Sequence, residues 1–267
     1  MINYNPEGSL LRRDQKELLL MLEELNKICK EHNIQWWLSS GTLLGAARHQ
    51  GFIPWDDDMD IVLLKKDYKR LEKILCEMQS EDFVFHCMKT DVDYINWFGK
   101  FRKKKGCVQS ANKRYNYYKW KGVGFDIFAI EKTNYISAKL AHRSYKIMQR
   151  YTINIKKNWI RKSLIRTIEY LHYYIIFPIL RLVGMYNPND EYHYTLGTGW
   201  PKHIFYMKNT FPLTTTNFEG KSLPVPKDMD EYLKNVYGDW RKMPSEEEIK
   251  KSIHCQEYRD EIFGKSK

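Results

Sequence analysis

Apolar residues recur along the chain at two different spacings, and together they predict a protein that mixes helices and strands. Leucines at helical spacing predict one amphipathic helix over Ser9–His32 and another over Asp67–Met78. Short apolar runs elsewhere are typical of strands. The expected strands are Ile34–Ser39, Ile61–Leu64, Phe83–Met88, Ile95–Phe101 and the apolar part of Gly122–Ile130. The pattern favours the α/β (α+β) class.

Residues 134–187 have a different character, because basic residues alternate there with tyrosine, isoleucine and tryptophan. We expect one or two helices, broken at Pro178. An apolar, aromatic side surrounded by Lys and Arg suits the interface of an anionic membrane. A helical cap packed on the rest of the protein fits the pattern equally well. Four side chains make the segment too polar to span a bilayer: Arg166, Glu169, His172 and Arg181.

The C-terminal residues are expected to complete the fold. Loops and short strands over 200–223 include a hairpin, and a helix over Asp228–Tyr237 ends at Gly238. A chain of 267 residues can bury a full core in one domain. We therefore expect a core over 1–133, the basic aromatic insertion over 134–187, and a part over 188–267 that completes the core.

The cysteines and the N-terminal residues indicate in which cellular compartment the protein is expected. The five cysteines have no metal-ligand or C-x-x-C spacing and predict reduced thiols. We expect no signal segment, and no run of about 18 apolar residues predicts a spanning helix. The expected location is the cytoplasm, with peripheral contact to the inner face of the cytoplasmic membrane as a further expectation.

Charge is unevenly distributed along the chain. Lys and Arg number 44 against 33 Asp and Glu, which gives a formal net charge of +11. Residues 94–125 contain no acid, and neither do residues 132–168. Such positive fields attract polyanions, which could be nucleotides, nucleic acid or anionic lipid. No recognised RNA or DNA module is present, so nucleic acid is not the expected partner.

The residues with the clearest chemistry lie between Trp36 and Leu64. A small-residue turn, Ser-Ser-Gly-Thr at 39–42, leads into a short helix over Leu43–Arg48, and acids at 56–58 and 60 run into an apolar strand. Alternation along a strand puts Asp58 and Asp60 on one side, where two carboxylates repel unless a divalent cation offsets the cost. Free backbone N–H groups at the turn suit a phosphate. The combination predicts phosphoryl or nucleotidyl transfer.

The same acids allow two other interpretations. Asp56, Asp58 and Asp60 match the first three positions of a calcium loop, but Ile61 stands where that loop needs Gly and Asp67 where it needs Glu. A calcium loop is therefore not expected. An acidic turn that only caps an element is the remaining alternative, and the adjoining Gly-Thr turn and apolar strand argue against it.

The run GTLLGAARHQGFIPWDDDMDI closely resembles the signature of the LicD family, phosphotransferases related to fukutin and fukutin-related protein in the nucleotidyltransferase superfamily. A second run, GVGFDIFAI, is similar to the family's apolar-Asp-Ile-Phe motif. The resemblance implies that Asp126 completes a Mg²⁺ (or Mn²⁺) site with Asp58 and Asp60. It also implies a nucleotidyltransferase-like mixed β-sheet flanked by helices, with residues 134–187 as a helical insertion. Similarity continues near the C-terminus as far as His254.

The resemblance also implies a reaction. The donor would be a CDP-activated alcohol such as CDP-choline, and the acceptor a hydroxyl of a cell-surface glycan (lipopolysaccharide, teichoic acid or capsule) or of its lipid-linked precursor, with release of CMP. Gly41 and Thr42 would hold a donor phosphate through backbone N–H and hydroxyl groups. Independently of the resemblance, Lys100 and Arg102 occupy alternate positions on the strand before Asp126, where they could neutralise phosphate charge, and Arg48 lies near the turn as a further phosphate contact. Phosphoglycerol and phosphoribitol remain open as cargo.

Several candidates stay open on the sequence alone. A choline cargo would need aromatic faces, which Trp36, Trp37, Trp55, Trp97 and the cluster 115–120 could supply. A D-x-D glycosyltransferase that uses a nucleotide sugar is the closest rival enzyme, and a nucleic-acid-binding protein is the alternative without catalysis. Among the other polar residues, we expect Glu131 to be a solvated strand end and His254 to have a structural role, and Asp239 is an outside candidate for the site.

Overall fold

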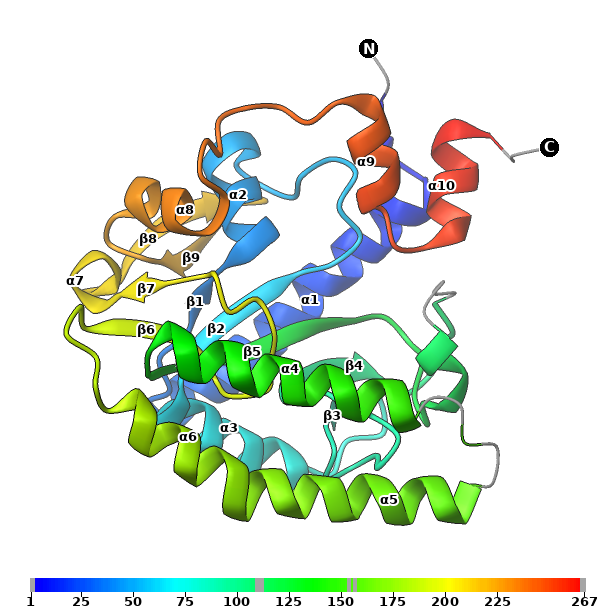
Figure 1. The fold of residues 1–267 in the computed structure, drawn as a ribbon. Coiled ribbons are helices and arrows are strands. Elements are labelled where there is room, and N and C mark those ends of the chain that lie inside the picture. The colour runs from blue at the N-terminus through cyan, green and yellow to red at the C-terminus, as the bar shows by residue number, and fades with distance from the viewer. Residues whose placement is uncertain (1–2, 109–112, 153–154, 156–157, 265–267) are drawn as a thin grey trace.

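A seven-stranded mixed sheet forms the centre of the protein (Figure 1). Its main path runs β1-β2-β5-β4-β3, with β6 paired to β5 and β7 to β6. The computed structural model describes residues 3–108, 113–152, 155 and 158–264. The expected α/β class with helices flanking a mixed sheet is confirmed. The strands are β1 (Trp37–Leu38), β2 (Asp60–Leu64), β3 (Phe83–His86), β4 (Gly99–Lys103), β5 (Gly124–Lys132), β6 (Glu191–Tyr194) and β7 (Phe205–Tyr206).

The two expected N-terminal helices are confirmed as α1 (Leu10–Glu31) and α3 (Lys65–Glu77). Helix α1 begins after Ser9, whose side chain accepts a hydrogen bond from the N–H of Arg12. Its leucines at helical spacing are buried, so one side of the helix packs into the main core. In Figure 1 α1 runs behind the sheet.

Helix α2 (Ser40–His49) begins three residues earlier than expected. Gly41 and Thr42 therefore lie in its first turn and not in a turn that precedes it. Ser40 has φ +48°, in the left-handed region, which is uncommon for a residue with a side chain. The backbone N–H groups of a first helical turn have no intrahelical acceptor, so they still suit an anion.

The expected strand over Ile95–Phe101 is wrong for residues 95–98. The carbonyls of Asp91 and Asp93 accept the N–H groups of Tyr94 and Ile95, and these turns keep the chain out of the sheet. Strand β4 begins only at Gly99, where a Cβ would lie 2.1 Å from Cζ of Phe85 on the neighbouring strand. A side chain at that position would collide with the ring.

The expected helix break at Pro178 is also wrong. The segment forms α4 (Tyr135–Thr152), α5 (Asn158–Leu171), a π-helical turn η2 (His172–Ile176) and α6 (Phe177–Gly184). The N–H of Phe177 bonds to the carbonyl of His172, five residues back, and Pro178 is the second residue of α6. The wider π turn precedes the proline, which has no N–H to donate, and the helix continues. Residues 153–154 and 156–157 of this segment lie outside the described residues.

The C-terminal part contains the expected hairpin and helix. These are β8 (Thr214–Phe218) with β9 (Lys221–Val225), and α8 (Met229–Tyr237), which ends at Gly238 with φ +70°. Two later helices, α9 and α10, were not anticipated. The remaining elements are the 3-10 helix η1 (Lys113–Tyr117), α7 (Met207–Thr210), α9 (Glu246–Ser252) and α10 (Gln256–Phe263).

Glu131, expected to be a solvated strand end, is buried with a relative exposure of 8%. Its carboxylate forms ion pairs with Lys65 of α3 and Arg181 of α6, and it accepts the N–H of Leu196. Burial alone would raise the pKa of this carboxyl, but the Arg181 hydrogen bond and the Lys65 charge outweigh it, and the pKa is lowered. Glu131 thus joins the helical segment to the sheet.

Candidate active site

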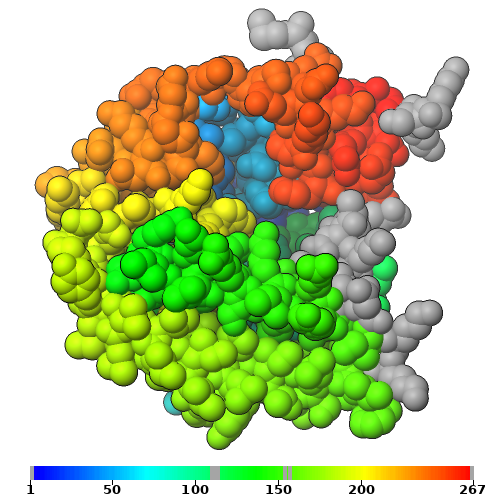
Figure 2. All heavy atoms as spheres, viewed as in Figure 1, coloured from blue at the N-terminus to red at the C-terminus, as the bar shows by residue number. Residues whose placement is uncertain are grey.

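A cavity of about 1060 Å³ lies over the ends of β2, β4 and β5. Figure 2 shows it as a hollow between α4 (green) and the C-terminal segments (orange and red), with the chain around α2 visible in its floor (blue). All but one of the expected site residues line it. Thr42 is the exception, and the residues that do line it are Gly41, Arg48, Asp58, Asp60, Lys100 and Asp126.

Strand pairing brings three of these residues side by side. Asp60 on β2 is the direct partner of Asp126 on β5, in parallel pairing, and Lys100 on β4 is the antiparallel partner of Asp126 on its other side. Directly paired residues point to the same face of a sheet. The structure therefore gathers two acids and one amine from chain positions 60, 100 and 126 in one row.

Lys100 forms an ion pair with Oδ1 of Asp126. Burial of the ammonium favours its neutral form, but attraction by Asp126 outweighs this, and the pKa of Lys100 is raised. The amine is therefore a fixed positive charge at neutral pH. It lies beside the acids, where its positive charge could compensate the negative charge of an anionic substrate.

The acids at the start of β2 and just before it have raised pKa values, because they are buried close to one another. Burial, followed by repulsion from Asp58 and Asp126, raises the pKa of Asp60 well above its usual value. Burial and the charge of Asp57 likewise raise the pKa of Asp58, and Asp56 is raised well above its usual value by burial and its acidic neighbours. Each of these shifts reflects a carboxylate that would gain from a nearby cation.

The first turn of α2 contributes backbone and hydroxyl groups next to these acids. Ser40, which sequence reasoning did not single out, lines the cavity and hydrogen-bonds the hydroxyl of Tyr194 at 3.1 Å. A Cβ on Gly41 would lie 2.8 Å from Oδ2 of Asp56, so glycine permits this close approach. The Thr42 hydroxyl is buried and accepts the N–H of Asp60 at 2.7 Å. Thr42 thereby fixes the start of β2 relative to α2.

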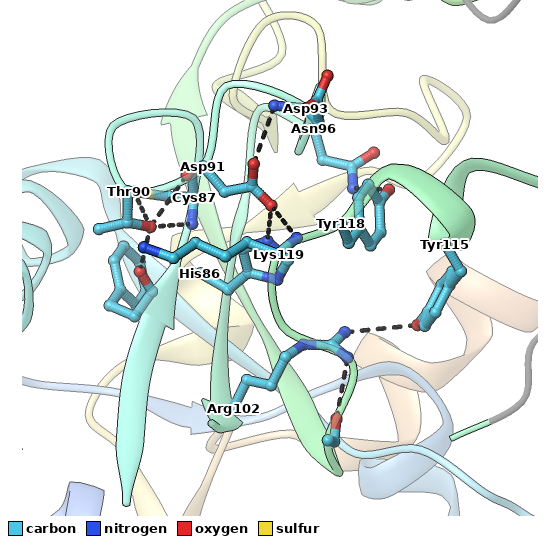
Figure 3. Close-up of polar contacts among 12 residues, drawn as sticks. His86, Cys87, Thr90, Asp91, Asp93, Asn96, Arg102, Tyr115, Tyr118 and Lys119 are labelled. Carbon is cyan, nitrogen blue, oxygen red and sulfur yellow. Dashed lines mark hydrogen bonds and ion pairs between the residues drawn. The ribbon is translucent and has the colours of Figure 1, made fainter. Parts of the chain in front are cut away.

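Arg102 adds a second buried cation to the cavity wall. It is 2% exposed, two residues along β4 from Lys100, and it has no carboxylate within ion-pair distance among the described residues. Nη1 donates to the carbonyl of Gly122 at 2.9 Å and Nη2 to the hydroxyl of Tyr115 at 3.4 Å (Figure 3). The strand alternation that singled out Lys100 also marks this position. A buried guanidinium paired only with neutral oxygens suits an anionic ligand.

Figure 3 shows how one buried acid organises the wall near Arg102. Asp91 accepts hydrogen bonds from Nε2 of His86 at 2.9 Å and from the N–H of Lys119 at 2.8 Å. Burial lowers the pKa of His86. Asp91 thus ties the loop before β4 to the loop that follows η1. These two loops bring Tyr94 and Tyr118 to the cavity.

The C-terminal segment closes the opposite side of the cavity. Asp57 accepts the N–H groups of His254 at 3.0 Å and Cys255 at 2.8 Å, as well as Nδ1 of His254 at 3.1 Å. The hydrogen bond to Asp57 and the charge of Asp58, 4.0 Å from Nδ1, raise the pKa of His254. His254, given a structural role from sequence, lies at the cavity, and so does Asp239.

The donor set suits a hard divalent cation, since Mg²⁺ and Mn²⁺ prefer carboxylate oxygens. Asp58, Asp60 and Asp126 supply such oxygens. Burial and, after it, repulsion by neighbouring carboxylates raise the pKa values of Asp58 and Asp60, and a bound cation would relieve the repulsion. Within the described part of the chain, however, no group of three His, Cys, Asp or Glu side chains is arranged so that it could hold a metal ion. Asp126 instead contacts Lys100.

Aromatic side chains form much of the remaining wall, but only some of those expected from sequence. Trp36 and Trp37 are buried in the main core, and Trp97 lines a different cavity. Trp55 reaches the candidate site. The aromatic residues that line it are Trp55, Tyr94, Phe98, Tyr115, Tyr118, Phe128, Trp200, Tyr237, Trp240 and Tyr258.

Comparison with known proteins gives three kinds of match. A family model described as LicD/FKTN/FKRP, nucleotidyltransferase domain, matches residues 33–179. The chain is 27% identical over 267 aligned positions to the lipopolysaccharide cholinephosphotransferase LicD of Haemophilus influenzae, across 92% of this chain and 97% of that protein. It is also 41% identical over 64 residues to human ribitol-5-phosphate transferase FKTN, and 44% over 41 residues to human ribitol 5-phosphate transferase FKRP. The latter two matches cover 24% and 15% of this chain and 13% and 8% of those proteins.

Proposed function

The chain belongs to the LicD family and is a LicD-like phosphotransferase, and on that premise we propose that it transfers phosphocholine from CDP-choline to a hydroxyl of a cell-surface glycan, releasing CMP. The observation that carries the proposal is the row of Asp60, Asp126 and Lys100 across three paired strands. The Haemophilus influenzae relative, named a lipopolysaccharide cholinephosphotransferase, supports the choice of cargo and acceptor.

Binding of the donor diphosphate would fall to the cations and to the first turn of α2. Lys100, which is partly buried, and Arg102, which is buried, carry positive charge on one strand, and Arg48 lines the same cavity. The N–H groups at the start of α2, around Gly41, offer a further anion contact. These groups would compensate charge as it develops on the transferred phosphoryl group, which is where catalysis of this kind gains most.

In the transfer step, an acceptor hydroxyl oxygen forms a bond to the phosphorus that carries the alcohol, and the bond from that phosphorus to the CMP oxygen breaks. The hydroxyl proton would pass to the carboxylate of Asp126, and CMP would leave with the electron pair of the broken bond. Lys100, held against Asp126, would keep this carboxylate in place.

Asp58, Asp60 and Asp126 would hold Mg²⁺ or Mn²⁺, which when bound would lower the pKa of the attacking hydroxyl and offset charge on the diphosphate. Because no three acids of the described residues are arranged here to hold a metal ion, binding would require these carboxylates to draw together. The carboxylate donor set and the mutual repulsion of these acids support this assignment.

The choice of choline as the transferred alcohol is supported by the aromatic lining of the cavity. A quaternary ammonium binds to aromatic faces, and the aromatic residues of the cavity could supply them. Phosphoribitol is the second candidate, because the two human relatives are named as ribitol phosphate transferases. A polyol would need hydrogen bonds from Ser40, Asn96 or similar polar residues of the same cavity.

The proposal is tested by presenting CDP-choline, CDP-glycerol and CDP-ribitol with Mg²⁺ and candidate glycans, and by measuring CMP release and the mass of the product. UDP-sugars serve as the negative control for glycosyl transfer. We expect CMP release and a phosphocholine-bearing glycan. Release of UDP, or no turnover of any CDP-alcohol, would overturn the proposal.

Substitution of the paired acids tests the site itself. Asp60→Asn and Asp126→Asn should each lower turnover by at least about 100-fold, because neither amide can balance the charge of a bound cation. Asp239→Asn, on the same cavity wall, is the matched control and should change turnover little. Near wild-type turnover by Asp60→Asn or Asp126→Asn would contradict the assignment.

A further inference from the structure

Exposed apolar side chains are concentrated in one part of the molecule. Residues 134–187 make up about a fifth of the chain, yet they contain 15 of the 20 large hydrophobic side chains that are exposed among the described residues. A patch of this size on a folded protein marks an interaction surface. We call the outward side of α4, α5, η2 and α6 the helical face. Helix α4 packs against both α5 and α6, so these exposed side chains lie on adjoining helices.

The exposed side of α4 alternates apolar and basic residues. Ile136, Leu140, Ile147 and Tyr151 are exposed at helical spacing, with relative exposures from 43% to 68%. Arg143, Lys146 and Arg150 are exposed among them. This pattern is typical of a helix that lies in a membrane interface, with apolar side chains inserted and cations at the headgroups.

A second stripe follows α5, η2 and α6. Leu171, Ile175, Ile179 and Leu182 are exposed at intervals of three or four residues, which places them along one side of the consecutive helical turns of α5, η2 and α6. The most exposed of these four is Leu182, at 68%. No helix within the described residues is both long enough and apolar enough to cross a membrane. The exposed apolar stripe therefore suits binding parallel to a surface and not insertion across a membrane.

The charge of the helical face distinguishes among its possible binding partners, which are a second copy of the protein, a nucleic acid and an anionic lipid surface. Residues 134–187 carry ten Lys and Arg but only one acid, Glu169. Arg161 and Lys162 pair with Asp93, and Arg181 pairs with Glu131. The exposed cations of the segment include Arg143, Lys146, Arg150 and Arg166. A symmetric dimer through this face would set the cations of one copy against those of the other, which is unfavourable. A nucleic acid would leave the exposed aliphatic side chains without apolar partners. An anionic lipid surface satisfies both the apolar and the basic residues.

We propose that the helical face docks on an anionic membrane surface. A second cavity of about 470 Å³ opens beside α5, and its lining includes basic residues, the tyrosines at 170, 173 and 174, and two acids, Glu72 and Glu169. Lys69 and Arg166 are exposed at this cavity and add positive charge beside the helical face. Figure 2 shows that the candidate active site opens on the side that α4 crosses. Docking would bring its mouth toward an acceptor carried on a lipid.

Membrane docking is separate from the transfer reaction, and its primary test measures binding to vesicles. Wild-type protein is sedimented with vesicles of phosphatidylcholine, and with vesicles in which about one third of the lipid is phosphatidylglycerol. We expect at least about tenfold tighter binding to the anionic vesicles, weakened by salt at roughly 0.5 M. Equal binding to both vesicles, or none, would overturn the proposal.

Two double variants test the two components of the helical face. Ile175→Asp with Leu182→Asp removes apolar contact, and Arg143→Glu with Arg150→Glu reverses charge. Each should reduce vesicle binding at least about tenfold. The charge variant alters only exposed side chains, so it keeps the test valid if the apolar variant does not fold. Unchanged binding by folded variants would contradict the proposal.

Matched controls make the same changes elsewhere. Leu20→Asp alters an exposed leucine of α1, and Lys27→Glu with Lys30→Glu reverses two exposed charges there. Both should bind vesicles like wild type. CMP release with a water-soluble acceptor should be retained in every variant, which separates loss of docking from failure of the proposed reaction. A concentration-dependent dimer that Leu182→Asp abolishes, without vesicle binding, would assign the face to a second copy instead.

Discussion

At the residue scale, the same residue type acquires different roles through its partners. Asp60 and Asp126 are adjacent in the sheet and face the cavity. Asp91, in contrast, accepts hydrogen bonds from His86 and Lys119 and has a structural role. The D-x-D and the later apolar-Asp motif pointed to the first two acids from sequence alone. Ser40 and the bonds of Asp57 could not be predicted, because they depend on contacts that strand and helix periodicity does not encode.

Glu131 gives a stability prediction. Glu131→Gln should lower the free energy of unfolding by about 2–4 kcal/mol at pH 7, since it leaves Arg181 and Lys65 without their buried anion. The pKa of Glu131 is lowered in the folded protein, so its contribution is present above its ordinary value of 4.5 and is lost as the pH falls through the folded value. The difference from wild type should therefore shrink in acid.

Urea denaturation from pH 7 down to about pH 3.5 measures this effect. Glu24→Gln is the control, because Glu24 is an exposed partner of Lys27, and it should change stability by less than about 0.5 kcal/mol. A Glu131→Gln cost that is the same at every pH would show that the charge is not responsible.

At the element scale, sequence periodicity predicted α1, α3, α8 and the β8–β9 hairpin, because each has a clear apolar repeat or turn signal. It failed for residues 95–98 and at Pro178. In the first case, turn hydrogen bonds outweigh the strand preference of an apolar run. In the second, a π turn accommodates the proline. Helices α9 and α10 are short and polar and carry no comparable repeat.

The link between the acidic run and the C-terminal helices gives a prediction at this scale. Asp57→Ala removes the acceptor for the N–H groups of His254 and Cys255, which lie 197 and 198 residues further along the chain. We expect faster hydrogen exchange in α10 and weaker donor binding, because that wall of the cavity is no longer held. Hydrogen-exchange mass spectrometry of peptides from residues 253–264 measures the first effect.

Asp239→Ala is the matched control for this change, since Asp239 lines the same cavity and makes no side-chain hydrogen bond or ion pair among the described residues. Exchange in α10 should stay at the wild-type level in that variant. If Asp57→Ala left α10 equally protected, the hydrogen bonds of Asp57 would not be what holds the segment.

At the scale of the whole molecule, repulsion among the site acids predicts that a bound divalent cation will raise the thermal stability of the protein. A cation that binds only the folded protein stabilises it by about 2.7 kcal/mol at 100 times its dissociation constant. For a chain of this size, that raises the Tm by roughly 5–10 °C. We expect such a rise with MgCl₂, measured by scanning calorimetry, and a much smaller one for Asp60→Asn.

Potassium chloride at the same ionic strength separates specific binding from screening, because general screening does not require divalent charge. It should leave the Tm nearly unchanged. An equal MgCl₂ effect on wild type and on Asp60→Asn would place the bound cation away from the proposed acids.

The pairing of β2, β5 and β4 has a consequence for how this enzyme could diversify. The proposed reacting groups stand on backbone-bonded strands, whereas part of the cavity wall, including Trp200, Tyr237 and Tyr258, follows residue 179, outside the region matched by the family model. The proposed chemistry and this part of the wall therefore lie on separate pieces of chain. Chimaeras that exchange only the wall-forming segments between relatives should acquire a new preference while keeping the ancestral reaction.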